Sequence, residues 1–310
     1  MNDYLSSERP VEYLDVSDIP RQRRGLTYTA PDGSARLYDL YYPDRGDGPF
    51  PLIVNISGGG WFYGQPTSPH LGRALHSSIH RGYAFASLAC TSSKYQKFPY
   101  QIREAKHALR HLRRHAAELD LDADFIAYWS FSSGGHLSLM AALTPDDGYF
   151  DDPLDADASC AVDAIAVMYP CCRLEATEDD FRAIGLEPEN YHSGLRSAEA
   201  YFLGAATEDA PELCKRADPI TYLHPDAPPV MLLHGTGDRV VPYTTSLEFA
   251  QRYREVVGSK TLLTRFLPGA GHSDPVFKSD VMCAEVLDFL DRVRLGQLPC
   301  PPERQGVDLS

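Results

Sequence analysis

Apolar residues in this chain occur mostly in short uninterrupted runs, which polar loops and segments of helical spacing separate. Runs of this length without alternation are typical of strands that lie buried inside a sheet. A further pair of runs, residues 26–29 and 36–42, flanks a Pro-Asp-Gly-Ser turn and predicts a hairpin. The pattern predicts buried strands over residues 51–56, 83–88, 125–129, 161–169, 229–234 and 261–267.

Segments with apolar residues at helical spacing follow several of these strands. The spacing predicts helices over residues 98–119, 136–143, 244–257 and 281–294. Alternating strands and helices favour an α/β fold, in which helices cover both faces of a mostly parallel sheet. Functional residues in such sheets gather at the carboxyl ends of the strands.

The pattern predicts one α/β domain with a polar segment at each end. Residues 1–25 predict an N-terminal arm, residues 26–295 the domain, and residues 296–310 a C-terminal tail. Residues 173–227 are less periodic, although residues 198–203 have helical character. We interpret this long segment as a small lid or cap inserted into the domain.

Composition and charge argue against some classes of function. The chain has 310 residues, of which 43% are apolar, so it can form a sizeable core. Its formal net charge of -14 argues against a nucleic-acid partner, because phosphate binding needs a basic face. The apolar runs are too short to span a membrane, and residues 1–10 lack the apolar region of a signal peptide. We expect a cytoplasmic protein whose seven scattered cysteines are reduced thiols.

Two stretches carry metal-binding residue types without the spacing of a known metal site. His107, His111 and His115 recur at helical spacing, but arginines surround them and no H-E-x-x-H pattern is present. Asp120-Leu121-Asp122-Ala123-Asp124 is acidic, but it lacks the glycine and the distal glutamate of a calcium loop. We interpret the acidic stretch as a connector before the next strand and predict no metal.

A turn of small residues, Ser130-Phe131-Ser132-Ser133-Gly134-Gly135, separates the strand at 125–129 from the helix at 136–143. A sharp strand-to-helix turn exposes the side chain at its centre, which here is Ser132. The helix N-terminus directs backbone N–H groups and the positive end of its dipole toward that side chain. A nucleophilic serine needs this arrangement, because the oxyanion formed by its attack must meet N–H donors.

Two later strand ends carry the residues that such a serine requires. Asp238 follows one strand and His272 follows the next, in the chain order of the α/β-hydrolase triad. We predict that Ser132 attacks an acyl carbonyl, that His272 accepts its proton, and that Asp238 fixes the imidazole tautomer. Asp274 is a rival acid, but it shares a loop with His272 and cannot easily reach the far nitrogen of the ring.

A glycine loop, Ser57-Gly58-Gly59-Gly60-Trp61, follows the strand at 51–56. Consecutive glycines let the backbone turn with positive φ and come close to a ligand. We expect the backbone N–H groups of Gly59, Gly60 and Ser133 to hold the oxyanion. Neither a G-x-G-x-x-G pattern nor a Walker lysine is present, and no cofactor is predicted.

Aromatic residues near the glycine loop are candidates for the substrate pocket. Trp61, Phe62, Tyr63 and Tyr95 would suit sugar rings and aryl acyl groups alike. The same residue types also suit a hydrophobic core, so both interpretations remain open.

Together these motifs resemble those of α/β-hydrolase esterases of the hormone-sensitive-lipase and acetyl/feruloyl xylan esterase branch, over residues 25–295. The resemblance implies hydrolysis of carboxylic esters through an acyl-enzyme, with a short acyl group such as acetyl on a sugar or small molecule. The matching segments are Ser57-Gly-Gly-Gly-Trp61, Phe98-Pro99, Ser130-x-Ser132-x-Gly134-Gly135-His136, Tyr169-Pro170, Pro228-Pro229, His234-Gly-x-x-Asp238-x-x-Val-Pro242 and Gly271-His272.

The chain departs from that family pattern at two positions. Ser57 stands where the family has the histidine that organises the oxyanion loop, and Ser130 stands where it has glycine. Three alternatives stay open: an arylformamidase, a peptidase of the same fold, and a binding protein without catalysis. Whether the chain forms a homo-oligomer is also left open.

Overall fold

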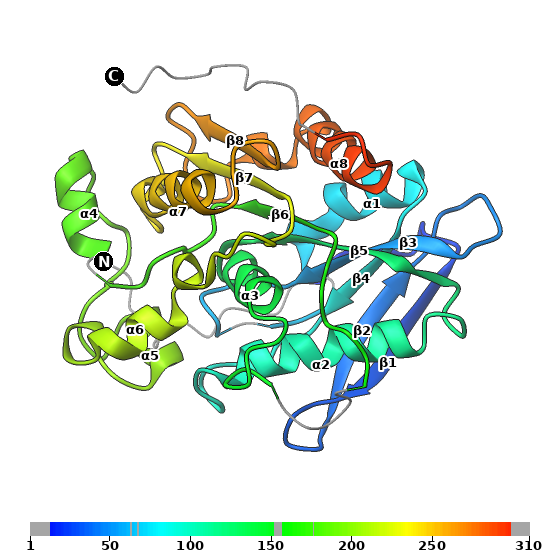
Figure 1. The fold of residues 1–310 in the computed structure, drawn as a ribbon, viewed down its shortest axis with the longest axis horizontal. Coiled ribbons are helices and arrows are strands. Elements are labelled where there is room, and N and C mark those ends of the chain that lie inside the picture. The colour runs from blue at the N-terminus through cyan, green and yellow to red at the C-terminus, as the bar shows by residue number, and fades with distance from the viewer. Residues whose placement is uncertain (1–12, 63, 67, 152–156, 176, 299–310) are drawn as a thin grey trace.

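The computed structural model describes residues 13–62, 64–66, 68–151, 157–175 and 177–298 (Figure 1). Within these residues an eight-stranded sheet has the order β1-β2-β4-β3-β5-β6-β7-β8. Its strands are β1 (Gln22–Thr29), β2 (Ala35–Tyr41), β3 (Phe50–Ile56), β4 (Ala84–Leu88), β5 (Leu121–Phe131), β6 (Ala164–Met168), β7 (Val230–Gly235) and β8 (Leu262–Leu267).

Most of this sheet is parallel. β2 pairs antiparallel with β1 and with β4, whereas every other neighbouring pair, from β4–β3 to β7–β8, is parallel. The predicted hairpin and the predicted mostly parallel sheet are therefore confirmed. Because parallel strands run the same way, the carboxyl ends of β3, β5, β7 and β8 lie along one edge of the sheet. The loops that leave these four ends carry the predicted chemistry.

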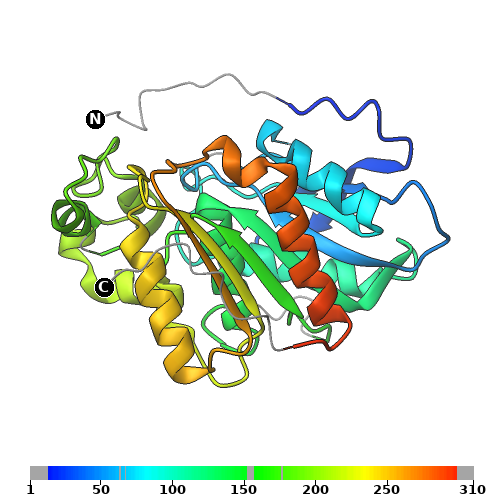
Figure 2. The same cartoon turned by 90° about the horizontal axis from the view of Figure 1, so that it is seen from above.

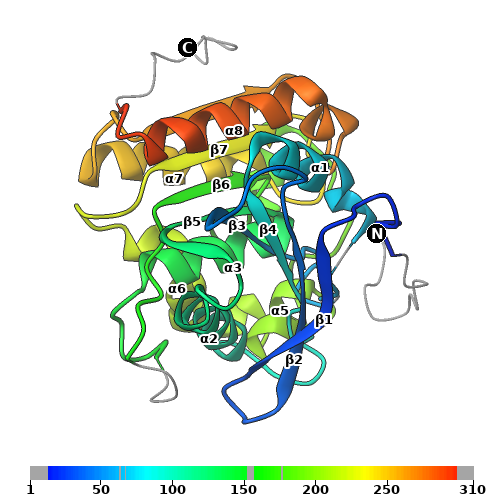
Figure 3. The ribbon, with the colours of Figure 1, turned by 90° about the vertical axis from the view of Figure 1, so that its right-hand side faces the viewer.

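Helices cover both faces of the sheet (Figure 2, Figure 3). Buried residues of α2 (Tyr100–Arg114), α3 (Ser132–Leu143) and α7 (Tyr243–Val256) pack in one cluster, and those of α1 (Gly72–Arg81) and α8 (Asp280–Arg294) pack in the other. The sequence pattern did not predict α1. None of the helices in the described ranges combines the length and the apolar character that crossing a membrane requires.

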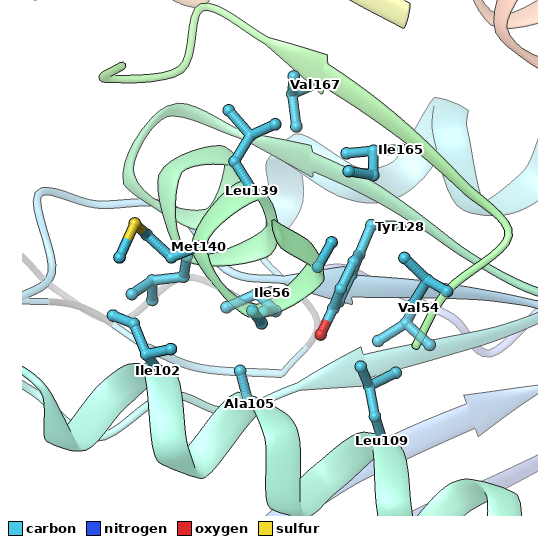
Figure 4. Packing of buried hydrophobic residues seen from close by; sticks show 14 of the residues in the cluster. Val54, Ile56, Ile102, Ala105, Leu109, Tyr128, Leu139, Met140, Ile165 and Val167 are labelled. Carbon is cyan, nitrogen blue, oxygen red and sulfur yellow. The ribbon is translucent and has the colours of Figure 1, made fainter. Parts of the chain in front are cut away.

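Side chains of each strand point alternately to the two faces of the sheet, so one strand contributes residues to both hydrophobic clusters. In β5, Ile126 and Tyr128 belong to the cluster under α2 and α3, whereas Ala127 and Trp129 belong to the cluster under α1 and α8. Figure 4 shows the first cluster, in which Ile102, Ala105 and Leu109 of α2 face β3 and β5. Strands buried on both faces explain why their sequences read as uninterrupted apolar runs.

The prediction of a connector over residues 120–124 is wrong, because β5 begins at Leu121. Leu121 pairs with Phe50 of β3, and the N–H of Phe50 donates to the carbonyl of Asp120 at 2.8 Å. The register between β3 and β5 shifts between Pro51 and Leu52, so the acidic residues form an irregular beginning of β5. Local sequence could not show this pairing, because its partner lies far away in the chain.

The inserted segment forms several short helices rather than one. They are α4 (Thr177–Ile184), α5 (Ala198–Leu203) and α6 (Pro211–Ala217), and they lie together on one side of the molecule (Figure 1). Only α5 was predicted as helical. The boundaries 1–25, 26–295 and 296–310 and the cap at 173–227 stay proposals, although β1 already begins within the proposed arm.

The turn between β5 and α3 lies directly against the end of β3. A Cβ atom built on Gly134 would come within 2.0 Å of the carbonyl oxygen of Ile56. No side chain fits there without moving one of these elements. Gly134 therefore lets the helix approach the strand closely.

We predict that Gly134→Ala lowers the free energy of unfolding by about 3 kcal/mol or prevents folding, because the added methyl group overlaps main-chain atoms. Chemical denaturation monitored by circular dichroism measures this change. Gly148→Ala is the matched control, since a Cβ there meets no atom within 4 Å. Equal stability of the two variants would contradict the close approach.

Candidate active site

Ser132 is the first residue of α3, directly after the last residue of β5. Its φ is 52°, a left-handed value that is uncommon for a residue with a side chain. Such strain at a strand-to-helix turn is the geometry of a nucleophile elbow. The glycine loop passes beside it, because a Cβ on Gly58 would lie 3.4 Å from the Cβ of Ser132.

The structure brings Ser132, His272 and Asp238 into one hydrogen-bonded chain. His272 Nε2 lies 3.0 Å from Ser132 Oγ, and His272 Nδ1 lies 2.7 Å from Asp238 Oδ2. A carboxylate only accepts, so Nδ1 carries the proton and donates to Asp238. Nε2 is then free to accept the hydroxyl proton of Ser132. The three residues come from loops at the ends of three strands, and their geometry is that of a nucleophile, a base and an orienting acid.

Asp238 is completely buried, yet four donors surround its carboxylate. Oδ1 accepts from the backbone N–H groups of Val240 at 2.8 Å and Val241 at 2.9 Å. Oδ2 accepts from His272 and, at 3.2 Å, from His234 Nε2. Burial alone would raise the pKa of Asp238, but the charge of His272 and these hydrogen bonds lower it well below its usual range. The carboxylate therefore stays ionised.

His234 is a supporting residue to which sequence reasoning assigned no role. Its Nε2 lies 3.2 Å from Asp238 Oδ2 and 3.0 Å from the carbonyl of Val241, so this nitrogen donates. Its Nδ1 accepts from the hydroxyl of Ser246 at 2.7 Å. The ring thus ties Asp238 to α7. Its position four residues before Asp238 in the quoted motif was the available signal.

Asp274, the rival acid, does not face the imidazole of His272. Its Oδ1 accepts from the backbone N–H of Val276 at 2.9 Å, and this bond caps the short helical turn Pro275–Lys278. Asp238 is instead the carboxylate within hydrogen-bond distance of His272.

The glycine loop has the backbone conformation that the sequence predicts. Gly59 and Gly60 have φ values of 124° and 62°, and Trp61 follows with 61°. Ser57 donates its hydroxyl proton to the carbonyl of Gln65, so the residue that replaces the family histidine helps to close the loop. The carbonyl of Trp61 also accepts from the N–H of Ser93 at 2.8 Å. These bonds hold the loop whose N–H groups, with that of Ser133 in α3, are the predicted oxyanion donors.

His136 joins this loop to α3, the helix that begins at Ser132. Trp61 Nε1 donates to His136 Nδ1 at 3.1 Å, and His136 Nε2 donates to the carbonyl of Ala217 at 2.7 Å. Burial lowers the pKa of His136 to about 4, so the ring is neutral and can accept from Trp61. One imidazole therefore connects the glycine loop, α3 and the inserted segment.

The structure separates the aromatic residues of the predicted pocket. Trp61 and Phe62 are buried, and Trp61 stacks on Phe202 with ring centroids 4.7 Å apart. Tyr95 is 82% exposed, and Tyr63 lies outside the described residues. Trp61 and Phe62 therefore pack in the hydrophobic core cluster beside the glycine loop. Their contact with a substrate stays a prediction, as does that of Tyr95.

Ser130 performs a backbone function that a glycine could not. Its buried hydroxyl accepts from the N–H of Ile56 at 3.1 Å and from the hydroxyl of Ser138 at 2.8 Å. The N–H of Ile56 at the end of β3 is thereby satisfied by a side chain of β5. This departure from the family pattern strengthens the junction on which the elbow rests.

His107 and His111 of α2, and His115 directly after its last residue, each have a different partner. His107 Nδ1 donates to the carbonyl of Thr29 at 3.2 Å, and His111 Nε2 lies 3.2 Å from the hydroxyl of Tyr38. His115 Nδ1 donates to the carbonyl of His111 at 2.9 Å. Across the residues that the structure describes, no three His, Cys, Asp or Glu side chains gather as a metal site would require.

Comparison with known protein families identifies the family of this chain. The BD-FAE family model matches residues 38–253, more than half of the chain. The chain belongs to the BD-FAE family.

A curated relative and two solved structures extend the comparison. Esterase LipQ of Mycobacterium tuberculosis is 29% identical over 281 residues, which are 89% of this chain and 62% of LipQ. A truncated carbohydrate esterase from gut microbiota superposes with a TM-score of 0.76 at 21% identity, covering 92% of this chain and all of that one. The bifunctional GH43-CE protein of Bacteroides eggerthii gives a TM-score of 0.75 at 26% identity, covering 90% of this chain and 38% of that one.

These likenesses establish the α/β-hydrolase fold for this BD-FAE member. The chain spans about three fifths of the length of the curated relatives that it matches first, since it covers 62% of each.

We predict that Ser130→Gly, which restores the residue of the family pattern, lowers the free energy of unfolding by about 1–3 kcal/mol. The reason is that the buried N–H of Ile56 then loses its acceptor. Urea denaturation of this variant and of Ser130→Thr, which keeps the hydroxyl, measures the effect. A Ser130→Gly variant as stable as the wild type would show that the hydroxyl bond contributes nothing.

We predict that stability falls as the pH drops from about 6.5 to about 4, through the protonation of His136. Because the folded pKa lies below the unfolded one, the contribution is fully present above the unfolded pKa and is lost as the pH falls. The window corresponds to on the order of 3 kcal/mol. Denaturation curves at several pH values give the free energy of unfolding of each variant. Between pH 6.5 and 4 this free energy should fall by about 3 kcal/mol less in His136→Gln than in the wild type.

The matched control for His136→Gln is His80→Gln, whose ring is largely exposed. We expect this variant to keep the pH profile of the wild type. If His136→Gln kept it too, the neutral buried imidazole would not be the cause.

Proposed function

We propose that this BD-FAE member hydrolyses carboxylic esters through an acyl-enzyme, and that its substrates are short-chain acyl esters, such as acetyl esters, of sugars or other small molecules. The observation that carries the proposal is the chain of bonds from Ser132 through His272 to the buried carboxylate of Asp238. Such a chain raises the nucleophilicity of a serine that would otherwise be inert at neutral pH.

In the first half-reaction Ser132 Oγ bonds to the acyl carbon while its proton passes to His272 Nε2. The carbonyl oxygen becomes an oxyanion, and the N–H groups of Gly59, Gly60 and Ser133 donate to it. The bond to the alkoxy oxygen then breaks, and His272 returns its proton to the leaving alcohol. The products are a free alcohol and an acyl group on Ser132.

In the second half-reaction water replaces the alcohol. His272 accepts a proton from water, the remaining hydroxide adds to the acyl carbon, and the acid leaves as Ser132 recovers its proton from His272. The ionised Asp238 stabilises the imidazolium in both halves. Because four donors hold that carboxylate, the ring keeps the same tautomer and direction throughout.

The preference for small acyl groups rests on the close packing around Ser132 and on the names of similar proteins. A Cβ added to Gly58 would lie 3.4 Å from the Cβ of Ser132, so a side chain there would touch the serine, and Trp61 and Phe62 are buried beside this loop. Two similar structures are named a carbohydrate esterase and a GH43-CE protein. These observations support acetyl esters of sugars over long-chain lipids.

We predict that Ser132→Ala lowers kcat for p-nitrophenyl acetate at least about a thousandfold and abolishes labelling by a fluorophosphonate, because the attacking oxygen is gone. Intact mass spectrometry should find one adduct on the wild type and none on the variant. Circular dichroism checks that both proteins are folded.

The control for Ser132→Ala is Ser259→Ala, an exposed serine between α7 and β8 that should keep both the rate and the adduct. A folded wild type that forms no adduct and hydrolyses no ester would overturn the proposed function. It would favour a binding protein that has kept the architecture of the site.

A further inference from the structure

One aromatic residue of the inserted segment, Phe202 in α5, is completely buried among rings from other parts of the chain. Its ring stacks on that of Trp61, with 4.7 Å between the centroids and 16° between the planes. His136 meets it edge-on at 5.4 Å, and Phe98 does so at 5.6 Å. Rings from outside the insertion therefore enclose a side chain of the insertion. If α5 opened as a lid, this ring would be exposed to water, which is unfavourable.

The carboxyl end of α5 receives hydrogen bonds from the loop that joins β4 to α2. The last carbonyl groups of a helix have no partner within the helix and need other donors. The N–H of Phe98 donates to the carbonyl of Phe202 at 2.8 Å, and Lys97 Nζ donates to the carbonyl of Tyr201 at 2.8 Å. Lys97 Nζ also donates to the carbonyl of Ser93 at 2.7 Å. The end of α5 is therefore anchored outside the inserted segment.

Contacts to its ring, its indole nitrogen and its carbonyl hold Trp61 in place. Phe202 stacks on the ring, and the indole Nε1 donates to His136, which donates to the carbonyl of Ala217 in α6. The N–H of Ser93 donates to the carbonyl of Trp61 at 2.8 Å. The contacts of the ring and of the indole nitrogen both lead to the inserted segment.

The backbone of Trp61 needs this support. Its φ of 61° is left-handed, a conformation that a bulky side chain rarely adopts. Such a conformation persists only where the surrounding contacts enforce it. The preceding residue is Gly60, whose N–H is a predicted oxyanion donor. A change in how the indole is held would therefore move the peptide groups of the glycine loop.

We propose that α5 is a fixed support of the glycine loop and that Phe202 is a positioning residue for the predicted oxyanion donors. The ring of Phe202 holds the indole of Trp61, and the indole fixes the backbone that carries the N–H groups of Gly59 and Gly60. Phe202 acts through Trp61 and not on the reacting atoms. This inference rests on the proposed function, and it gives part of the inserted segment a role in catalysis.

Loss of the ring of Phe202 should weaken binding of the transition state more than binding of the substrate. The donors meet a full negative charge only when the oxyanion has formed, so displaced donors lower kcat and leave KM nearly unchanged. Complete loss of one such donor lowers kcat about 100-fold to 1,000-fold in related chemistry. Displacement without loss should cost a smaller factor, of at least about ten.

The first experiment replaces Phe202 by leucine, which keeps the apolar character and removes the stacked ring. We expect Phe202→Leu to lower kcat for p-nitrophenyl acetate at least about tenfold, with KM changed by less than about twofold. A trifluoromethyl ketone forms a hemiketal oxyanion on Ser132, so its affinity should fall by the same factor as kcat/KM. Titration with a fluorophosphonate counts the active molecules, and the rates are divided by that number.

Phe181→Leu is the matched control. Phe181 is also buried in the inserted segment, but its ring lies against His192, at 5.4 Å between the centroids. This variant should lose stability as Phe202→Leu does and keep the wild-type kcat. A Phe202→Leu variant that keeps kcat and the affinity for the ketone would overturn the inference and leave the proposed function standing. A wild type that hydrolyses no ester would overturn both.

A second experiment distinguishes a fixed support from a lid. A Cβ on Gly204, directly after α5, would lie 3.8 Å from the Cβ of Lys97, which is the usual separation in a disulfide. In the double variant Lys97→Cys/Gly204→Cys, this bond would fasten α5 to the loop that joins β4 to α2. We expect the oxidised protein to hydrolyse p-nitrophenyl acetate at least as fast as the same protein after reduction.

The comparison within one protein removes other effects of the two substitutions. Gly204 has a φ of 84°, and any strain from a side chain there is present in both redox forms. Peptide mass mapping verifies the bond, and the wild type with and without the reductant shows the effect of its own thiols. An oxidised form that is at least about tenfold slower than the reduced form would show that α5 must open during turnover, and would overturn the inference.

Discussion

The contact between the turn at Ser132 and the end of β3 is the constraint on which the rest of the site depends. Gly134 lies where any side chain would overlap the carbonyl of Ile56, and Gly58 lies where a side chain would press on the turn. Two glycines therefore let a strained residue, Ser132, face the glycine loop at contact distance. Because main-chain atoms meet there, the position of Ser132 relative to the glycine loop follows from backbone geometry.

The charge state of Asp238 is the second constraint on the site. The buried carboxylate of Asp238 stays ionised because donors from its own loop, from His234 and from His272 surround it. A buried carboxylate with fewer donors would take up a proton and would lose its hold on the imidazole. Its loop and the helix α7 thus act as one unit with the base.

Motifs at strand ends predicted the fold, and the three residues that they pointed to form one hydrogen-bonded chain, because the carboxyl ends of parallel strands lie along one edge of the sheet. Contacts between distant segments that no strand-end motif marks were beyond such reasoning. The bond from Trp61 to His136 and the pairing of Leu121 with Phe50 each join segments far apart in the chain. The helices of the inserted segment were also hard to predict, because short helices that pack on loops show little hydrophobic periodicity in the sequence.

The two departures from the family pattern show how a local hydrogen bond can replace a family residue. Ser57 closes the glycine loop on Gln65, and Ser130 caps the N–H of Ile56, so each hydroxyl supports a part of the elbow junction. Neither hydroxyl takes part in the proton path between Ser132 and Asp238. Substitutions that would be suspect when read from the motif alone are therefore structural in effect.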